Sequence, residues 1–262
     1  RRQRQMCIRD RIEEKDIWEL IFTPSDDRSR WICAVDLSAG KIITPLFNGS
    51  MWKAANDQLL LETGGRYQLC DLNGSLTDVS IPHTGHVLAV DDQGYVLCQY
   101  PVTRTVRTDS GTMPYTFHQY TLLGPDFTVL QDGIDQYYNV GQYDYSCDSE
   151  LFYNGLVAVR VGATDWYLPD GGPWPRLYFN SKYMFIDRSG KTVSSSRYDE
   201  VSHENDRWFG CHGTTEYLLD SNGNEREQAN YCYVPSTWAE NIVEQAEKDG
   251  LRLSYHTPYR LN

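Results

Sequence analysis

The sequence lacks the uncharged apolar segment of about 18 residues that a membrane-spanning helix requires. It also lacks any Cys-x-x-C pair, and this absence argues against a zinc ribbon or a thioredoxin-like redox centre. Outside one segment near the C-terminus, apolar residues do not recur with helical spacing, so a fold that alternates strands and helices is not expected. The sequence therefore predicts no transmembrane segment, no metal centre and no cofactor.

Basic charge is also scarce, since the net charge is −12 at pH 7. Residues 1–11 hold five arginines against one aspartate, and they resemble a translation of the transposase adapter that is used to fragment DNA for sequencing. Without them the chain has 19 basic and 35 acidic residues, a net charge of −16. A chain this acidic repels phosphate backbones, so nucleic acid is not an expected partner. The alternative is a genuine basic arm that binds nucleic acid or a membrane.

The adapter resemblance divides the chain into three parts. Residues 1–11 are interpreted as a non-native segment, 12–233 as a β-repeat domain, and 234–262 as a C-terminal helix and tail packed on that domain. Under this interpretation the native N-terminus is missing, and an export signal or a further domain is expected upstream of residue 12.

Short hairpins are expected wherever an apolar run is followed by Asp-x-x-Gly. The aspartate caps such a turn by accepting a backbone N–H, and the glycine supplies the positive φ that closes it. The four clearest copies and one looser copy are Gln68–Gly74, Leu88–Gly94, Met184–Gly190, Tyr217–Gly223 and Cys33–Gly40. Consecutive apolar residues before the aspartate predict strands that are buried on both faces.

These hairpins predict an all-β fold. Frequent turns between short strands are typical of a sandwich, a barrel or a propeller, and repetition favours a β-propeller-like array or a meander. Between Asp91 and Asp187 the unit is degenerate or carries insertions, with Leu122–Phe127 and Tyr167–Gly172 as candidate copies.

Three segments in the second half follow a further pattern. Tyr183–Lys191 reads YMFIDRSGK, Tyr198–Val201 reads YDEV, and Asn154–Val159 reads NGLVAV. They resemble the bacterial WG-repeat proteins, whose units run aromatic-Gly-aromatic-Ile-Asp-x-x-Gly-Lys and continue with Tyr-Asp-x-Val. This chain departs from the family at Met184, where the family has glycine, and it contains no Trp-Gly pair. The resemblance implies an all-β repeat protein, often exported or lipid-anchored, with no shared chemistry.

The C-terminal segment is expected to form one α-helix. Thr237 and Glu240 have the spacing of a capping box, and Gly250 is a natural stop. Apolar residues between them fall on one stripe, which favours a helix packed on the β-domain over a helix that binds a partner.

Polar residues suggest several kinds of site. His83 and His86 lie close in sequence and would need a third ligand, such as Cys211 or His212, to hold a metal; the alternative, which we favour, is a pair of turn histidines. Paired carboxylates suited to glycoside hydrolysis are most plausible among those near aromatics: Asp144, Asp165, Asp170 and Asp206. The Asp220–Asn224 segment lacks the later ligands of a calcium loop and is interpreted as a hairpin turn.

The strongest candidate for a binding site is the aromatic-rich stretch 136–179. Tyrosine and tryptophan beside carboxylates suit a sugar ring, and they equally suit a protein partner. The predicted ligand-binding residues are Tyr143, Tyr145, Asp165, Trp166, Asp170, Trp174 and Tyr178. An aromatic core between sheets is the other interpretation of the same residues.

The leading prediction is a non-enzymatic binding or scaffold module of an extracellular or cell-surface bacterial protein, with a glycan or a protein as its ligand. Two alternatives remain open. One is a glycoside-active enzyme on a propeller that uses paired carboxylates, and the other is a purely structural repeat domain of a larger protein.

Overall fold

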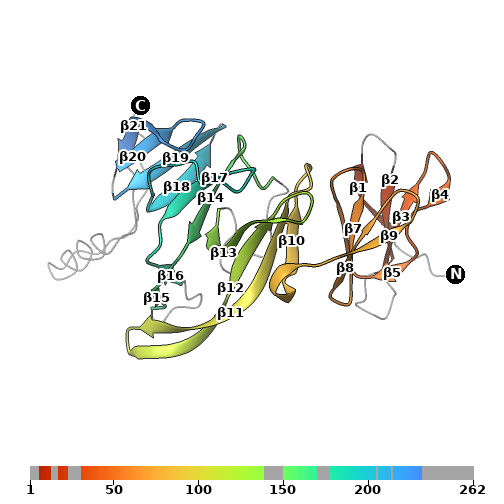
Figure 1. Ribbon diagram of the computed structural model, residues 1–262, viewed down its shortest axis with the longest axis horizontal. Helices are drawn as coiled ribbons and strands as arrows, with labels where there is room; N and C mark the ends of the chain where they lie inside the picture. Colours follow the sequence, from red (N-terminus) through yellow and green to blue (C-terminus); the bar gives the residue numbers. More distant parts are fainter. Residues whose placement is uncertain are drawn as a thin grey trace. The chain divides into compact units, whose positions relative to one another are not determined.

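The computed structural model describes residues 6–12, 17–22, 31–138, 150–169, 177–204, 206–213 and 215–231. Within these ranges every regular element is a β-strand except one 3-10 turn, η1 (Pro82–Thr84) (Figure 1). The all-β prediction is therefore confirmed. The described strands form no closed barrel or propeller. The helix expected within 234–262 lies outside the described residues.

The chain divides into two compact units. The first comprises Arg1–Pro101, His118–Asp132 and Tyr145–Leu151, and the second comprises Val102–Phe117, Gly133–Asp144 and Phe152–Asn262. The division passes through three strands of the long hairpin region, because each unit takes the part of the strand that packs in its own core.

The first unit contains two antiparallel sheets. One has the order β1-β2-β3-β4, with β5 also paired to β3, and the other is the meander β6-β7-β8-β9. The bounds in the first sheet are β1 (Met6–Ile12), β2 (Ile17–Phe22), β3 (Trp31–Asp36), β4 (Lys41–Ile42) and β5 (Phe47–Asn48). Those in the second are β6 (Ser50–Lys53), β7 (Leu59–Thr63), β8 (Arg66–Cys70) and β9 (Leu76–Val79).

The largest sheet has eight strands in the order β16-β15-β11-β12-β13-β14-β17, with β10 also paired to β11. Two of its strands are 13 residues long and form one extended hairpin. The bounds are β10 (His86–Val90), β11 (Val96–Thr108), β12 (Gly111–Leu123), β13 (Val129–Tyr137), β14 (Leu156–Val161), β15 (Trp166–Tyr167), β16 (Tyr178–Phe179) and β17 (Tyr183–Asp187). The Asp-x-x-Gly unit is irregular between Asp91 and Asp187, and this hairpin and the β15–β16 ribbon occupy much of that interval.

The fourth sheet is another antiparallel meander and belongs to the second unit. Its strands follow one another in chain order: β18 (Glu200–Glu204), β19 (Arg207–His212), β20 (Thr215–Leu219) and β21 (Glu225–Tyr231). The register of β20 on β21 shifts twice, so two β-bulges interrupt this pairing.

The Asp-x-x-Gly turns form as the sequence predicts. In the turn at Asp71, the Oδ1 atom accepts the backbone N–H groups of Asn73 and Ser75, each at 2.8 Å, and Gly74 adopts a φ of 89°. The same double acceptance recurs in three further turns, those at Asp91, Asp187 and Asp220. These turns match a type I turn followed by a left-handed residue, the usual three-residue hairpin loop.

The degenerate copy Leu122–Phe127 also forms a hairpin loop, which joins β12 to β13. Its left-handed position is held by Phe127, at a φ of 64°, where the other turns have glycine. The Asp126 carboxylate caps this loop by accepting the backbone N–H and the hydroxyl of Thr128. A bulky residue at positive φ is strained, and burial of part of the Phe127 ring against the core of the first unit offsets that strain.

Strands β3 and β17 are buried on both faces, as their continuous apolar runs predict. Strand β10 instead alternates between buried and partly buried residues. In the second unit the core gathers around Phe185, Tyr198 and Trp208. Tyr198 is fully buried, donates its hydroxyl to the carbonyl oxygen of Gly223 at 3.0 Å, and packs directly against Gly210.

Candidate functional site

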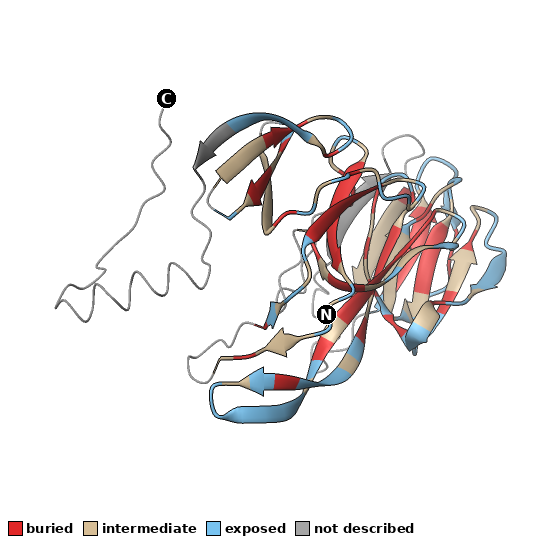
Figure 2. Cartoon of the chain, turned by 60° about the vertical axis from the view of Figure 1, so that its left-hand side comes forward, coloured by how far each residue is buried: buried red, intermediate tan, exposed pale blue. Residues whose placement is uncertain are grey.

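A two-stranded ribbon, β15–β16, lies along the edge of β11 in the second unit. Arg107 of β11 pairs with Tyr167 of β15, and Tyr167 pairs in turn with Tyr178 of β16. Figure 2 shows that the hairpin end beside this ribbon is largely exposed, in contrast to the buried half of β11 that begins at Val96. The ribbon therefore adds its side chains beside the exposed end of the β11–β12 hairpin.

One face of this ribbon is a small apolar core. Trp166 and its partner Phe179 pack with Phe117, the Trp166 and Phe117 ring centroids lying 6.3 Å apart. The fully enclosed members of the cluster are Val106, Phe117, Leu168 and Leu177. These residues fix the ribbon on the hairpin.

The opposite face carries Tyr167 and Tyr178, because side chains alternate along each strand. Their ring centroids lie 6.2 Å apart with the ring planes tilted by 32°. Tyr178 is 44% exposed, which is high for a large aromatic side chain. The exposed Tyr178 ring thus lies beside the partly buried Tyr167 ring at the surface.

Charged groups flank these rings. The Arg107 guanidinium binds both carboxylate oxygens of Asp165, with Nε 2.8 Å from Oδ1 and Nη2 2.5 Å from Oδ2. The same guanidinium lies 5.7 Å from the centroid of the Tyr167 ring, within cation–π range. The Tyr167 hydroxyl donates to the carboxylate of Asp109. We call Arg107, Asp109, Asp165, Tyr167 and Tyr178 the aromatic face.

The charge state of Asp165 follows from this pairing. Hydrogen bonding and charge attraction from Arg107 hold the pKa of the Asp165 carboxyl below its usual range. Asp165 also raises the pKa of the Arg107 guanidinium through the same hydrogen bonds. Both groups are therefore ionised at neutral pH, and they offer a fixed pattern of donors and acceptors beside the rings.

Three of the predicted site residues are described, and the structure brings two of them to the aromatic face. Asp165 and Tyr178 belong to the aromatic face, whereas Trp166 lies on the other side of the ribbon with its ring toward the apolar core. Four others, Tyr143, Tyr145, Asp170 and Trp174, lie outside the described residues.

The sequence-based prediction missed Arg107 and Asp109. Each bonds to a residue 58 positions further along the chain, Asp165 and Tyr167 respectively. The signal available in the sequence was a segment rich in threonine and arginine over 103–108, which is typical of a largely exposed strand and gives no information about the strand beside it.

The histidines occupy separate environments. His83 lies in the η1 turn at a φ of 57°, stacks on Tyr100 with 4.2 Å between centroids, and bonds through Nε2 to Asp132 at 2.8 Å. His212 bonds to Glu225 at 2.9 Å. Over the part of the chain that the structure describes, no cluster of three histidine, cysteine, aspartate or glutamate side chains has the geometry to hold a metal ion.

No protein-family model matches the chain, and no curated protein matches it either. Among the described residues, no helix has the length and apolar character needed to cross a membrane.

Proposed function

We propose that this chain is a binding module of an exported or cell-surface bacterial repeat protein, and that it recognises a glycan through the aromatic face. The observation that carries the proposal is the exposed Tyr178 ring, which lies beside the partly exposed Tyr167 ring and the ionised Arg107–Asp165 pair. Exposed aromatic residues on a rigid scaffold are a common form of recognition surface.

The chemistry of a sugar matches this surface in two respects. A sugar ring has an apolar face of C–H groups, which stacks on the flat face of a tyrosine ring. Its hydroxyl groups are both donors and acceptors, so they can donate to Asp165 or Asp109 and accept from Arg107. A protein partner would require a wider desolvated area, with an apolar centre, than these five residues supply.

The proposal extends to the repeat architecture. The two four-stranded antiparallel meanders, β6–β9 and β18–β21, have the strand number and connectivity of propeller blades. Four turns share one Asp-x-x-Gly geometry, which supports a common hairpin unit of the WG-repeat type. We propose that the chain is an open meander of such units, with the β11–β12 hairpin and the β15–β16 ribbon as its binding insertion.

An alternative proposal is a glycoside-active enzyme. Such an enzyme needs a general acid whose pKa is raised, so that the carboxyl keeps its proton at working pH. Asp165 has the opposite shift, because Arg107 stabilises its ionised form. Asp165 therefore suits an acceptor of hydroxyl protons better than a proton donor, and this observation favours binding over hydrolysis.

The proposal is tested with a glycan panel and two matched variants. Tyr178→Ala removes an exposed ring from the aromatic face, and Trp31→Ala removes an aromatic ring of similar exposure (38%) from the first unit. We expect the native chain and Trp31→Ala to bind the same glycans with equal affinity. Tyr178→Ala should lose about tenfold or more, the usual magnitude for one stacked ring.

Two results would contradict the proposal. One is equal binding by Tyr178→Ala and the native chain, and the other is an absence of binding across the panel. Release of sugar from a bound glycan, abolished by Asp165→Asn, would instead establish the enzyme.

A further inference from the structure

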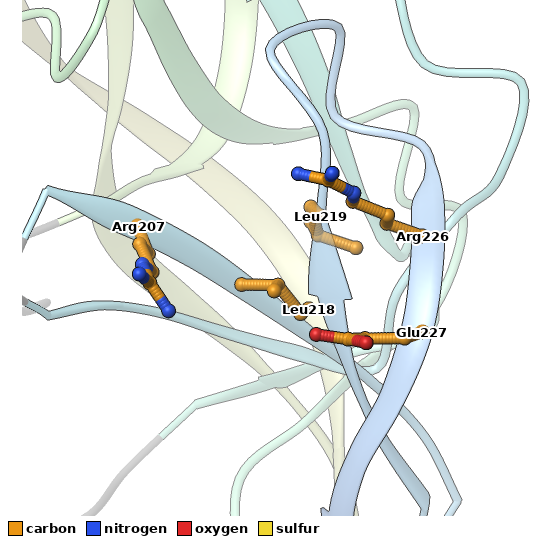
Figure 3. Close-up of a pocket in the computed structure, with 5 residues that line it drawn as sticks. All are labelled: Arg207, Leu218, Leu219, Arg226 and Glu227. Carbon is orange, nitrogen blue, oxygen red and sulfur yellow. The ribbon is translucent and has the colours of Figure 1, made fainter.

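An open pocket lies on the terminal meander of the second unit, lined by Arg207, Leu218, Leu219, Arg226 and Glu227 (Figure 3). Figure 3 shows the two arginines on opposite sides of the leucines, and Leu219 belongs to the core of this unit. Because the two guanidinium groups do not converge on a common point, the pocket defines no ligand. The first unit carries a site of another kind, which is defined by covalent chemistry.

Two tripeptides of the first unit have the same sequence, Asn-Gly-Ser. They are Asn48–Ser50 and Asn73–Ser75, and each follows an apolar residue. Asn-x-Ser is the acceptor sequence for N-linked glycosylation of exported proteins. The two copies differ in charge two positions before the asparagine, where the first has Leu46 and the second has Asp71. They are therefore a matched pair of acceptors that only one acidic residue distinguishes by charge.

Asn73 lies at the tip of the hairpin that joins β8 to β9. The preceding Leu72 packs against the core of the first unit, and its carbonyl oxygen accepts a hydrogen bond from the Lys41 ammonium at 2.9 Å. Asn73 itself is exposed, and its side-chain amide forms no hydrogen bond with another residue that the structure describes. The amide nitrogen therefore faces solvent, where an attached glycan has room to extend.

Asp71 places an ionised carboxylate two positions before this acceptor. The hydrogen bond from the Ser75 backbone, followed by that from Asn73, holds the pKa of the Asp71 carboxyl below its usual range. A transferase that binds its acceptor through a cationic side chain would distinguish Asp71 from Leu46, because a carboxylate forms a charge-assisted pair with that side chain and a leucine does not.

The folded chain engages the backbone around both acceptors. The Gly74 N–H donates to the carbonyl oxygen of Asp71 at 2.9 Å, and a Cβ atom at Gly74 would lie 2.9 Å from the carbonyl oxygen of Ile43. Asn48 is paired with Trp31 across strands β5 and β3. A transferase that draws the acceptor into its active site therefore meets either asparagine most readily before the strands close.

We propose that Asn73 is N-glycosylated during export and that Asp71 selects it over Asn48. The donor is an oligosaccharide joined to a lipid carrier through pyrophosphate. The side-chain nitrogen of Asn73 forms a bond with the anomeric carbon of the first sugar, and the bond from that carbon to the pyrophosphate oxygen breaks. The lipid pyrophosphate leaves with the electron pair, and the amide proton passes to a base of the transferase. The inference rests on the export that the proposed function includes.

The test directs the full chain to the periplasm of a bacterial host that has the lipid-linked donor and a transferase that requires an acidic residue. We expect the intact mass to rise by one oligosaccharide, and peptide mapping to place it on Asn73. Asn73→Gln and Ser75→Ala should abolish the addition. Asp71→Asn keeps an acceptor oxygen for the turn and should lower occupancy about tenfold or more, since it removes the charged partner. Asn48→Gln is the matched control and should change nothing.

A gain of modification tests the selection directly. Leu46 is 53% exposed, so Leu46→Asp leaves the core intact and gives Asn48 the same acidic neighbour. We expect a second oligosaccharide on Asn48 in this variant. Modification of Asn48 in the native chain, no modification of Asn73, or no gain with Leu46→Asp overturns the inference. Failure of the proposed function is seen separately, because Tyr178→Ala should weaken glycan binding and leave the occupancy of Asn73 unchanged.

Discussion

Arg107 and Asp165 lie 58 positions apart in the chain, and the guanidinium of the first binds both carboxylate oxygens of the second. This ion pair fastens the segment before β15 to the edge of β11. It also sets the polarity of the surface beside Tyr167, whose ring lies under the same guanidinium. One contact thus serves both the attachment of the ribbon and the proposed recognition of hydroxyl groups.

The ion pair should show itself in the pH dependence of stability. Arg107 lowers the folded-state pKa of Asp165, so its stabilising effect is complete above the ordinary aspartate range, about pH 4, and is lost as the pH falls through the depressed value. We expect Asp165→Asn to melt at a lower temperature than the native chain near neutral pH. The two melting temperatures should converge toward about pH 2. A difference that stays constant with pH would show that packing, rather than charge, is responsible.

The hairpin turns should depend on their aspartates. The Oδ1 atom of buried Asp91 accepts the N–H groups of Gln93 and Tyr95, at 3.0 and 2.9 Å. Asp91→Ala leaves both donors without this acceptor, and we expect a loss of about 1–3 kcal/mol in the free energy of unfolding. Denaturant unfolding measures this change. Asp91→Asn keeps an acceptor oxygen, so it should retain most of the stability; an equal loss in both variants would contradict the capping role.

A close approach in the second unit favours glycine at position 210. A Cβ atom at this position would lie 2.4 Å from Cδ1 of the fully buried Tyr198 ring. We expect Gly210→Ala to cost about 1–3 kcal/mol in unfolding free energy, the usual range for overpacking a core. Tyr198→Leu alone should also destabilise, but the double variant should be less destabilised than the sum of the two. Additive losses would mean that the ring is not the cause.

The turn at Asp91 and the contact of Gly210 with Tyr198 differ in how far local sequence predicts them. The turn at Asp91 is closed by residues within four positions of each other, so the Asp-x-x-Gly pattern alone predicts its hydrogen bonds correctly. The contact of Gly210 in β19 with Tyr198, a residue outside the strands that forms an isolated bridge with Tyr183, is a packing contact within one core, and no pattern in the sequence marks it. The same holds for Arg107 and Asp165, whose meeting depends on the parallel pairing of β11 with β15.

Local sequence also predicts only part of the candidate site. The aromatic-rich composition pointed to Asp165, Trp166 and Tyr178, which the structure places in or beside the β15–β16 ribbon; their role in binding stays a prediction. It did not separate Trp166 from the other two, because a strand only two residues long is too short to show an alternation between faces.

The buried cysteines should be unreactive in the folded chain. Burial raises the pKa of the Cys98 thiol to about 12 and also raises those of Cys33 and Cys70. The thiolate is the reactive form, so alkylation by iodoacetamide near pH 8 should be very slow at these three positions until the protein unfolds. Peptide mapping by mass spectrometry reads each position separately. Rapid alkylation of Cys98 in the native chain would contradict the packing of the first unit.

The most direct test of glycan recognition is a map of ligand-induced NMR shifts on the isotopically labelled chain. Cellohexaose, maltohexaose and chitohexaose serve as probes, because they share stacked pyranose rings but differ in their linkages and substituents. We expect at least one of them to shift the backbone amides of Arg107, Asp165, Tyr167 and Tyr178 together, with a single saturation curve. Shifts that cluster away from these residues, or no shifts with any of the three, would contradict the proposed role of the aromatic face.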